Sequence, residues 1–212
     1  MKILFSDDHI VVCIKPSGVL STKDSSGKAN MQDMLCSELG VKEVFPVHRL
    51  DREVSGIMVY ALSAFAAAKL SADVADHTRF VKEYEALISG CPESDEGVFE
   101  DLLFKDSSKN KTFVVKKERR GVKEAKLKYT VLEKCRYKAL VRVRLFTGRT
   151  HQIRVQFASR KMPIVGDRKY GGSPHPYGIQ LFSVRLCFSH PISGEKIDFE
   201  ITPEGLKEYV YE

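Results

Sequence analysis

The sequence predicts an α+β protein built on a large, mixed but mainly antiparallel β-sheet with helices on its flanks. Strand-like segments outnumber helical ones, and most of them follow one another directly, which is typical of hairpins. Glycine and proline are spread evenly along the 212 residues, without a repeat or a long linker. We therefore expect one continuous domain over residues 1–212.

The first third of the chain combines both kinds of element. Apolar runs bounded by turn residues predict strands at 3–5, 10–15 and 56–62. Helical spacing predicts a short helix over 30–39 and a longer one over 63–77, for which Ser63 is a candidate N-cap.

From residue 80 the apolar residues alternate with a period of two, which indicates half-buried antiparallel strands. Strands are expected at 80–89, 97–104, 111–117, 125–134 and 138–146. Helical spacing returns over 150–160, where Thr150 is a candidate N-cap. Residues 179–191 and 196–201 predict a final hairpin with its turn at Ser193–Gly194.

Composition favours a protein with an anionic partner. The net charge is +6, the sequence pI is about 9.0, and 43% of the residues are apolar, enough for a sizeable core. A basic chain of this kind suits nucleic acid above other partners.

The cysteines favour a reducing compartment. Five cysteines are widely scattered and form no CxxC pair, which argues against a disulfide framework or a thiolate zinc site. We expect a cytoplasmic protein, without a signal peptide or a membrane span.

Common catalytic and cofactor motifs are missing from the sequence. There is no GxSxG, HExxH, Walker A or GxGxxG pattern, and the histidines lack metal-ligand spacing. We expect no metal and no cofactor, so any chemistry must come from ordinary side chains.

Two stretches are unusually rich in ionisable residues. The first, "VHRLDREVSG" at 47–56, is either a solvated loop or the setting of a functional Asp51. The second, "RLFTGRTHQIRVQFA" at 144–158, is either an exposed basic surface or an anion site. A tight turn at Thr147–Gly148 puts Arg149 at a helix N-terminus, where phosphate is bound readily. Arg154 lies one turn further, between apolar neighbours, where a guanidinium is half-buried or paired.

These stretches carry a resemblance to a known family. "HRLDREVSGIMVYA" is similar to the catalytic signature HRLDxxTSGxxxxA of the RluA-type RNA pseudouridine synthases. "KPSGVLS" (15–21), "VKEYEALISG" (81–90), "TGRTHQIRVQFA" (147–158), "PIVGDRKYGG" (163–172) and "HPISGEKIDFEITP" (190–203) resemble further family motifs, in the family's order. The resemblance covers residues 3–203.

The resemblance implies an isomerase that needs no cofactor. In that reaction the N1–C1′ bond of a uridine in RNA breaks, the uracil turns, and C5 bonds to C1′. Asp51 matches the essential aspartate, Tyr84 the active-site tyrosine that stacks on the flipped base, and Arg154 the arginine expected within ion-pair distance of Asp51. The fold would be the family's catalytic fold, with the active site in a cleft across the sheet.

Further basic residues are candidates for contacts with RNA. Arg49 is the expected aid to base flipping, and Lys15, Lys82, Arg149 and Arg168 are expected phosphate contacts. The basic run at 114–128 either extends this surface or is merely an exposed hairpin.

The departures from the family pattern concern the choice of substrate. Val54 replaces a usual Thr, Gln156 a frequent His, and "LFSVRLCF" the more usual LHAxxLxF. The chain begins directly at the first motif, so no N-terminal S4 RNA-binding domain is expected. The partner is ribosomal or transfer RNA, no membrane is involved, and the expected state is a monomer. A non-catalytic RNA-binding protein and a metal-independent RNA hydrolase are the alternatives.

Overall fold

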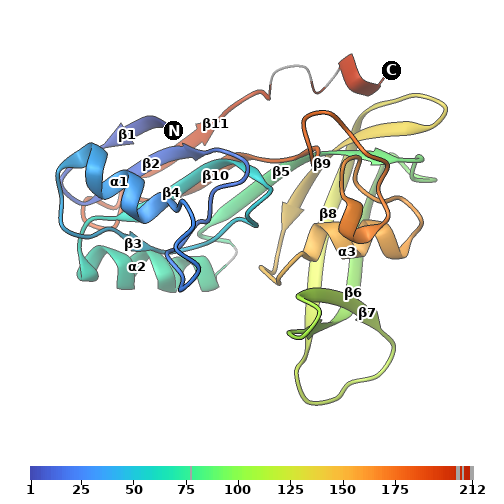
Figure 1. The fold of residues 1–212 in the computed structure, drawn as a ribbon, viewed down its shortest axis with the longest axis horizontal. Coiled ribbons are helices and arrows are strands. Elements are labelled where there is room, and N and C mark those ends of the chain that lie inside the picture. The colour runs from blue at the N-terminus through green and yellow to red at the C-terminus, as the bar shows by residue number, and fades with distance from the viewer. Residues whose placement is uncertain (77, 204–205, 207, 211–212) are drawn as a thin grey trace. The chain divides into compact units, whose positions relative to one another are not determined.

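The computed structural model describes residues 1–76, 78–203, 206 and 208–210, and Figure 1 shows its elements. The chain forms two compact units. The first comprises Met1–Lys82 with Ser183–Thr202, and the second comprises Glu83–Phe182 with Pro203–Glu212. Strands β5 and β10 contribute residues to both units. The expectation that residues 1–212 act as one domain stays a prediction.

The first unit is a small, mainly antiparallel β-sheet with two helices. Its strands follow the order β1 (Lys2–Ser6), β2 (Ile10–Lys15), β4 (Ser55–Ala61) and β10 (Leu181–Ser189). β11 (Lys196–Glu200) pairs with β10, and β3 (Phe45–Pro46) pairs with β4. The helices are α1 (Met31–Leu39) and α2 (Ala64–Ala75).

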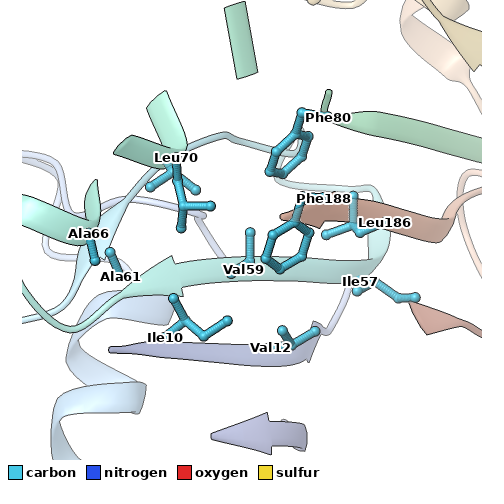
Figure 2. Packing of buried hydrophobic residues seen from close by; sticks show 11 residues of the cluster. Ile10, Val12, Ile57, Val59, Ala61, Ala66, Leu70, Phe80, Leu186 and Phe188 are labelled. Carbon is cyan, nitrogen blue, oxygen red and sulfur yellow. The ribbon is translucent and has the colours of Figure 1, made fainter. Parts of the chain in front are cut away.

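An apolar cluster between α2 and the strands forms the core of this unit (Figure 2). Leu70 of α2 packs with Val59 of β4 and Phe188 of β10, all of them buried. The rings of Phe80 and Phe188 stack with centroids 5.3 Å apart. Ser63 caps α2, because its side-chain oxygen accepts a hydrogen bond from the Ala66 N–H at 3.2 Å.

The second unit is an antiparallel sheet with one main helix. Its strands follow the order β5 (Val81–Ser89), β9 (Lys138–Leu145), β8 (Val122–Lys134), β6 (Glu96–Asp106) and β7 (Lys111–Val115). α3 (Gln152–Ser159) packs on it through Val155, which contacts Leu103 and Ala125. Two 3₁₀ turns follow, η1 (Arg168–Tyr170) and η2 (Glu208–Val210).

The connection between β7 and β8 is not a hairpin. Both strands pair with β6, so the chain crosses from one side of β6 to the other over residues 116–121. This loop extends beyond the strands at the lower edge of Figure 1. An exposed, charged segment therefore stands at one end of the second unit.

The structure confirms the predicted fold class: mainly antiparallel strands with flanking helices. The helix expected at 63–77 ends at Ala75, and residue 77 lies outside the described residues. No helix in the described part of the chain is long and apolar enough to cross a membrane.

The predicted Thr150 N-cap of α3 is wrong. The helix begins after His151, which has φ of 54° and makes no capping hydrogen bond through its side chain. The side-chain oxygen of Gln152 instead accepts hydrogen bonds from the Arg149 N–H at 3.0 Å and the Thr147 hydroxyl at 2.8 Å. The side chain of Gln152, rather than that of Thr150, therefore makes the hydrogen bonds at the start of α3, and they fix the turn before the helix.

Candidate active site

Asp51 lies in the loop between β3 and β4. Residues 15–21 form hydrogen bonds to the backbone of this loop. The Arg52 carbonyl accepts hydrogen bonds from the Gly18 N–H at 2.8 Å and from Lys15 Nζ at 3.0 Å. The Ser17 hydroxyl donates to the Glu53 carbonyl at 2.7 Å. The "KPSGVLS" segment is therefore the support of the Asp51 loop.

Lys15 is a buried part of this support. Its side chain is fully buried, and its ammonium group donates to the carbonyls of Pro16 (2.9 Å), Val19 (2.8 Å) and Arg52. Burial lowers the pKa of Lys15 from 10.5 to about 8, while the charges of Asp51 and Glu53 oppose this shift. All three ammonium hydrogens have acceptors, so the geometry does not favour the expected phosphate contact.

Ser21 fixes the residue that precedes the aspartate. Its hydroxyl donates to the Leu50 carbonyl at 2.8 Å and accepts from the Leu50 N–H at 3.0 Å. The Ser21 carbonyl in turn accepts from the Tyr60 hydroxyl at 2.7 Å. One buried serine therefore satisfies both backbone groups of Leu50 and ties them to β4.

His48 and Gly56 position the two ends of the loop. His48 Nε2 accepts from the Val59 N–H at 3.1 Å, and burial lowers the pKa of His48 from 6.5 to about 3, so the ring is neutral. Gly56 has φ of 125°, and a Cβ atom there would lie 2.2 Å from the Ser183 carbonyl oxygen. Only glycine fits this approach of β4 to β10.

The remaining charges of the loop face solvent. Arg49, Arg52 and Glu53 are exposed, and Arg52 Nε donates to the Gly18 carbonyl at 3.0 Å. Arg52 and Glu53 are thus at the surface, whereas His48 and Leu50 make hydrogen bonds that hold the loop.

In the second unit, Arg154 forms a buried, bidentate ion pair with Asp167. Arg154 Nε lies 2.7 Å from Asp167 Oδ2, and Nη2 lies 2.8 Å from Oδ1. The two side chains are 3% and 1% exposed, respectively. Two of the five guanidinium N–H groups are thus fixed, which sets the orientation of the whole planar group.

Tyr170 adds a second constraint beside this pair. Its ring centroid lies 5.4 Å from the Arg154 guanidinium carbon. Its hydroxyl accepts from the Thr112 N–H at 2.8 Å and lies 2.9 Å from His151 Nδ1. Burial raises the pKa of Tyr170, so the hydroxyl keeps its proton. The tyrosine therefore links β7, η1 and the start of α3.

The "PIVGDRKYGG" segment supplies Asp167, the buried partner of Arg154. The exposed Arg168 was predicted to contact phosphate, but no role was predicted for its buried neighbour Asp167. Gly166 has φ of 83°, and a Cβ atom there would lie 1.9 Å from the Gly178 carbonyl oxygen. The motif itself was visible in the sequence, and it was the only signal for Asp167.

Tyr84 and Lys82 are both largely buried on β5. Tyr84 is 6% exposed and pairs in register with Val143 of β9. Lys82 is 5% exposed, its Nζ lies 5.8 Å from the Phe80 ring centroid, and burial lowers its pKa to about 8. A phosphate contact through Lys82 therefore requires that RNA enter deeply.

Arg149 lies between the predicted anion turn and β8. Its Nε donates to the Glu124 carbonyl at 2.9 Å. The Thr147 hydroxyl accepts from the Lys126 N–H at 2.9 Å, so the turn is anchored on β8. The predicted Arg149 contact stays a prediction.

The three expected catalytic residues are thus supported within their own units. Asp51 belongs to the first unit, and Tyr84 and Arg154 belong to the second. The expected Asp51–Arg154 ion pair stays a prediction. Among the described residues, no group of three or more His, Cys, Asp or Glu side chains has the geometry to hold a metal ion.

Comparison with known proteins identifies the family. The family model described as RNA pseudouridylate synthase matches residues 9–159. The chain is 32% identical to the "Ribosomal large subunit pseudouridine synthase D" of Zymomonas mobilis, over 94% of this chain and 68% of that protein. It is 30% identical to the "tRNA pseudouridine synthase C" of Vibrio parahaemolyticus, over 93% of this chain and 88% of that protein.

A solved structure supports the fold. The human protein "RNA Pseudouridylate Synthase Domain Containing 4" superposes with a TM-score of 0.79 at 22% identity, covering 99% of this chain and 92% of that one. The supported aspartate loop, the oriented arginine and these matches lead to one conclusion. The chain belongs to the RluA-type RNA pseudouridylate synthase family, whose enzymes isomerise uridine in RNA to pseudouridine.

Proposed function

We propose that the protein converts one or more uridines of ribosomal or transfer RNA to pseudouridine, with Asp51 as the catalytic carboxylate. The two relatives act, by their names, on ribosomal and on transfer RNA, respectively. The observation that carries the role of Asp51 is the series of hydrogen bonds that Lys15, Ser17, Gly18 and Ser21 make to residues 50–53. A merely solvated loop has no need of such support.

The chemistry requires a carboxylate held at the sugar or the base. The N1–C1′ bond breaks, C5 bonds to C1′, the hydrogen on C5 leaves as a proton, and N1 gains a proton, so that the product is an isomer of uridine. A fixed carboxylate can attack carbon or stabilise the cation-like sugar in this process. Fixing the loop before RNA binds removes an ordering cost from the reaction step.

Arg154 and Tyr84 complete the proposed site. Arg154 keeps Asp51 ionised by ion pairing, and its buried pair with Asp167 supports this role by fixing the guanidinium plane. The Tyr84 ring stacks on the flipped uracil.

We assign the RNA contacts according to exposure. Arg49 assists base flipping, Arg149 and Arg168 contact phosphates, and Lys82 contacts RNA that has entered the site. Lys15 instead supports the Asp51 loop. The protein acts as a cytoplasmic monomer without a metal or another cofactor.

The test is proton release from RNA labelled with tritium at C5 of uridine, together with mapping of pseudouridine in total RNA. The wild type should release tritium and modify specific sites. Asp51→Asn should bind the same RNA and release none. Arg154→Lys should lose most activity, because a lysine cannot reproduce the bidentate pair. Activity of Asp51→Asn near that of the wild type would disprove the assignment, and shortened RNA would indicate a hydrolase.

A further inference from the structure

The net positive charge of the chain is concentrated in one segment. Residues 105–128 contain ten lysines and arginines and three acidic residues, a net charge of +7, whereas the whole chain has +6. The remaining residues together therefore carry a net charge of −1. This segment consists of the end of β6, β7, the crossing loop and the start of β8.

Eight of these ten cations, all except Lys105 and Lys111, form two groups. Lys126 pairs with Glu100 at 2.6 Å, Lys128 with Glu96 at 2.7 Å, and Lys109 with Asp106 at 3.9 Å. These ion pairs neutralise their charges along the strands.

The second group forms what we call the basic loop: Lys116, Lys117, Arg119, Arg120 and Lys123. All five are exposed, and no carboxylate among the described residues lies within ion-pair distance of them. Five positive charges within eight residues repel one another. Binding of an anionic partner reduces this electrostatic repulsion.

The basic loop is anchored rather than loosely attached. The Arg119 guanidinium carbon lies 4.4 Å from the Phe104 ring centroid, which fastens the middle of the loop to β6. The loop also covers an open hollow of about 490 Å³ lined by Leu102, Glu118, Arg119, Val122 and Glu124. Glu118 and Glu124 make this hollow unsuitable for a phosphate, so the exposed cations are the anion-binding feature.

Contacts connect the basic loop to the proposed site within the second unit. The Thr112 hydroxyl of β7 donates to the Thr150 carbonyl at 2.9 Å, and Lys111 Nζ lies 5.0 Å from the Tyr170 ring centroid. On β8, Arg149 binds the Glu124 carbonyl. Both strands that carry the basic loop are thus fixed to the elements that hold Arg154.

We propose that the basic loop binds the phosphate backbone of RNA outside the target nucleotide. The inference rests on the proposed function, because it takes RNA as the substrate. Five unpaired cations on an anchored loop suit a regular array of phosphates, whose binding releases counterions. The loop would hold a flanking stem of the substrate while the target uridine enters the site.

The test compares two triple variants that remove the same charge. Lys116→Gln/Lys117→Gln/Arg120→Gln removes three unpaired cations, and Lys109→Gln/Lys126→Gln/Lys128→Gln removes three paired ones. The probe is a fluorescein-labelled RNA stem-loop, titrated at several salt concentrations. The basic-loop variant should bind at least tenfold more weakly at low salt. Its slope of log K against log salt should fall by about 2–3, or about 0.7–0.9 for each lost contact.

The paired-lysine variant is the matched control and should keep most of the affinity and the slope. Equal losses in both variants would overturn the proposal, because net charge alone would then explain binding. Unchanged RNA binding by the basic-loop variant would also overturn it and would direct attention to an acidic protein partner.

Catalysis separates this inference from the proposed function. The basic-loop variant should keep kcat for tritium release at saturating RNA and show a raised KM. A reduced kcat with unchanged KM would refute the proposed role. Failure of the wild type to release tritium from any RNA would refute the proposed function. The comparison of RNA binding by the two triple variants would still test whether the basic loop binds RNA.

Discussion

The two halves of the proposed site hold their functional groups by different means. The Asp51 loop is held mainly through its own backbone, by hydrogen bonds from residues 15–21 to residues 50–53. Arg154 is held through its side chain, by the buried carboxylate of Asp167. The first arrangement fixes the loop while leaving the carboxylate to react, and the second fixes the charged group itself.

The difference predicts where each half is vulnerable. A backbone support is distributed over several bonds, so losing one bond weakens it by degrees. The buried ion pair depends on two side chains only, so replacing Asp167 removes both hydrogen bonds of the pair at once. The following variants test this contrast.

The largest effect is expected for Asp167→Asn. This change removes the buried carboxylate that binds Arg154 in a bidentate manner, at a cost of about 3–5 kcal/mol in the free energy of unfolding. Urea denaturation measures it. Asp198→Asn is the matched control, since Arg185 binds Asp198 in the same bidentate manner but both side chains are about a third exposed. Its expected cost is about 0–1 kcal/mol, and equal costs would contradict the contrast.

Lys15→Met should have the next largest effect. Three carbonyls lose a buried donor, so we expect a loss of about 2–4 kcal/mol in urea denaturation. The salt slope of RNA binding should not change, because Lys15 is buried. Lys69→Met on the exposed surface of α2 is the control for removing a lysine. A reduced slope without a loss of stability would restore Lys15 as a phosphate contact.

Ser21→Ala should weaken the aspartate loop by about 1–3 kcal/mol, because both backbone groups of Leu50 lose their partner. Tritium release should show a lower kcat with little change in KM, as expected when a reacting group is less well placed. Ser17→Ala, which removes a single exposed bond to Glu53, should have a clearly smaller effect. Equal losses of stability and kcat in Ser21→Ala and Ser17→Ala would mean that the hydrogen bonds to Leu50 are no more important than the bond to Glu53.

The smallest effect concerns pH. The folded-state pKa of His48 is lowered to about 3, so below pH 6.5 the unfolded chain binds a proton that the folded chain does not. Stability contributed by the neutral ring is therefore lost as pH falls through 6.5, by roughly 1–2 kcal/mol at pH 5. His48→Gln should lose less stability between pH 7.5 and pH 5 than the wild type in thermal or urea unfolding. Parallel losses in the two proteins would assign the acid sensitivity to other groups.

Local patterns in the sequence predicted the elements well. Ser63 caps α2 as expected, and the alternation over 138–146 produced β9 with its apolar residues buried. These features depend on neighbours within a few residues, which a pattern can show.

Features that depend on distant partners were not predicted. The N-terminus of α3 is organised by the side chain of Gln152 rather than by Thr150, and nothing in the spacing distinguishes the two. Lys15 was expected to contact phosphate, which requires an accessible ammonium group, whereas its side chain is fully buried. Its three carbonyl acceptors come from two segments that meet only in the fold.

The motifs predicted the candidate site residues. They did not predict the residues that hold them in place. Asp51, Tyr84 and Arg154 were selected through the family resemblance. The partner of Arg154 is thirteen residues away in sequence, and burial of both groups is a tertiary property. A carboxylate that orients a guanidinium cannot be told from a surface acid without the packing around it.

The approach of Gly56 to Ser183 has a consequence for the synthesis of the chain. Both units are discontinuous, but Ser183–Thr202 must join residues synthesised more than a hundred positions earlier, whereas most of the second unit is the contiguous segment Glu83–Phe182. During translation the arginine-bearing part can therefore fold before β4 obtains β10 as its neighbour. The strand that follows the Asp51 loop has an open edge until then, and the unit that carries Asp51 is complete only after Thr202 has been synthesised.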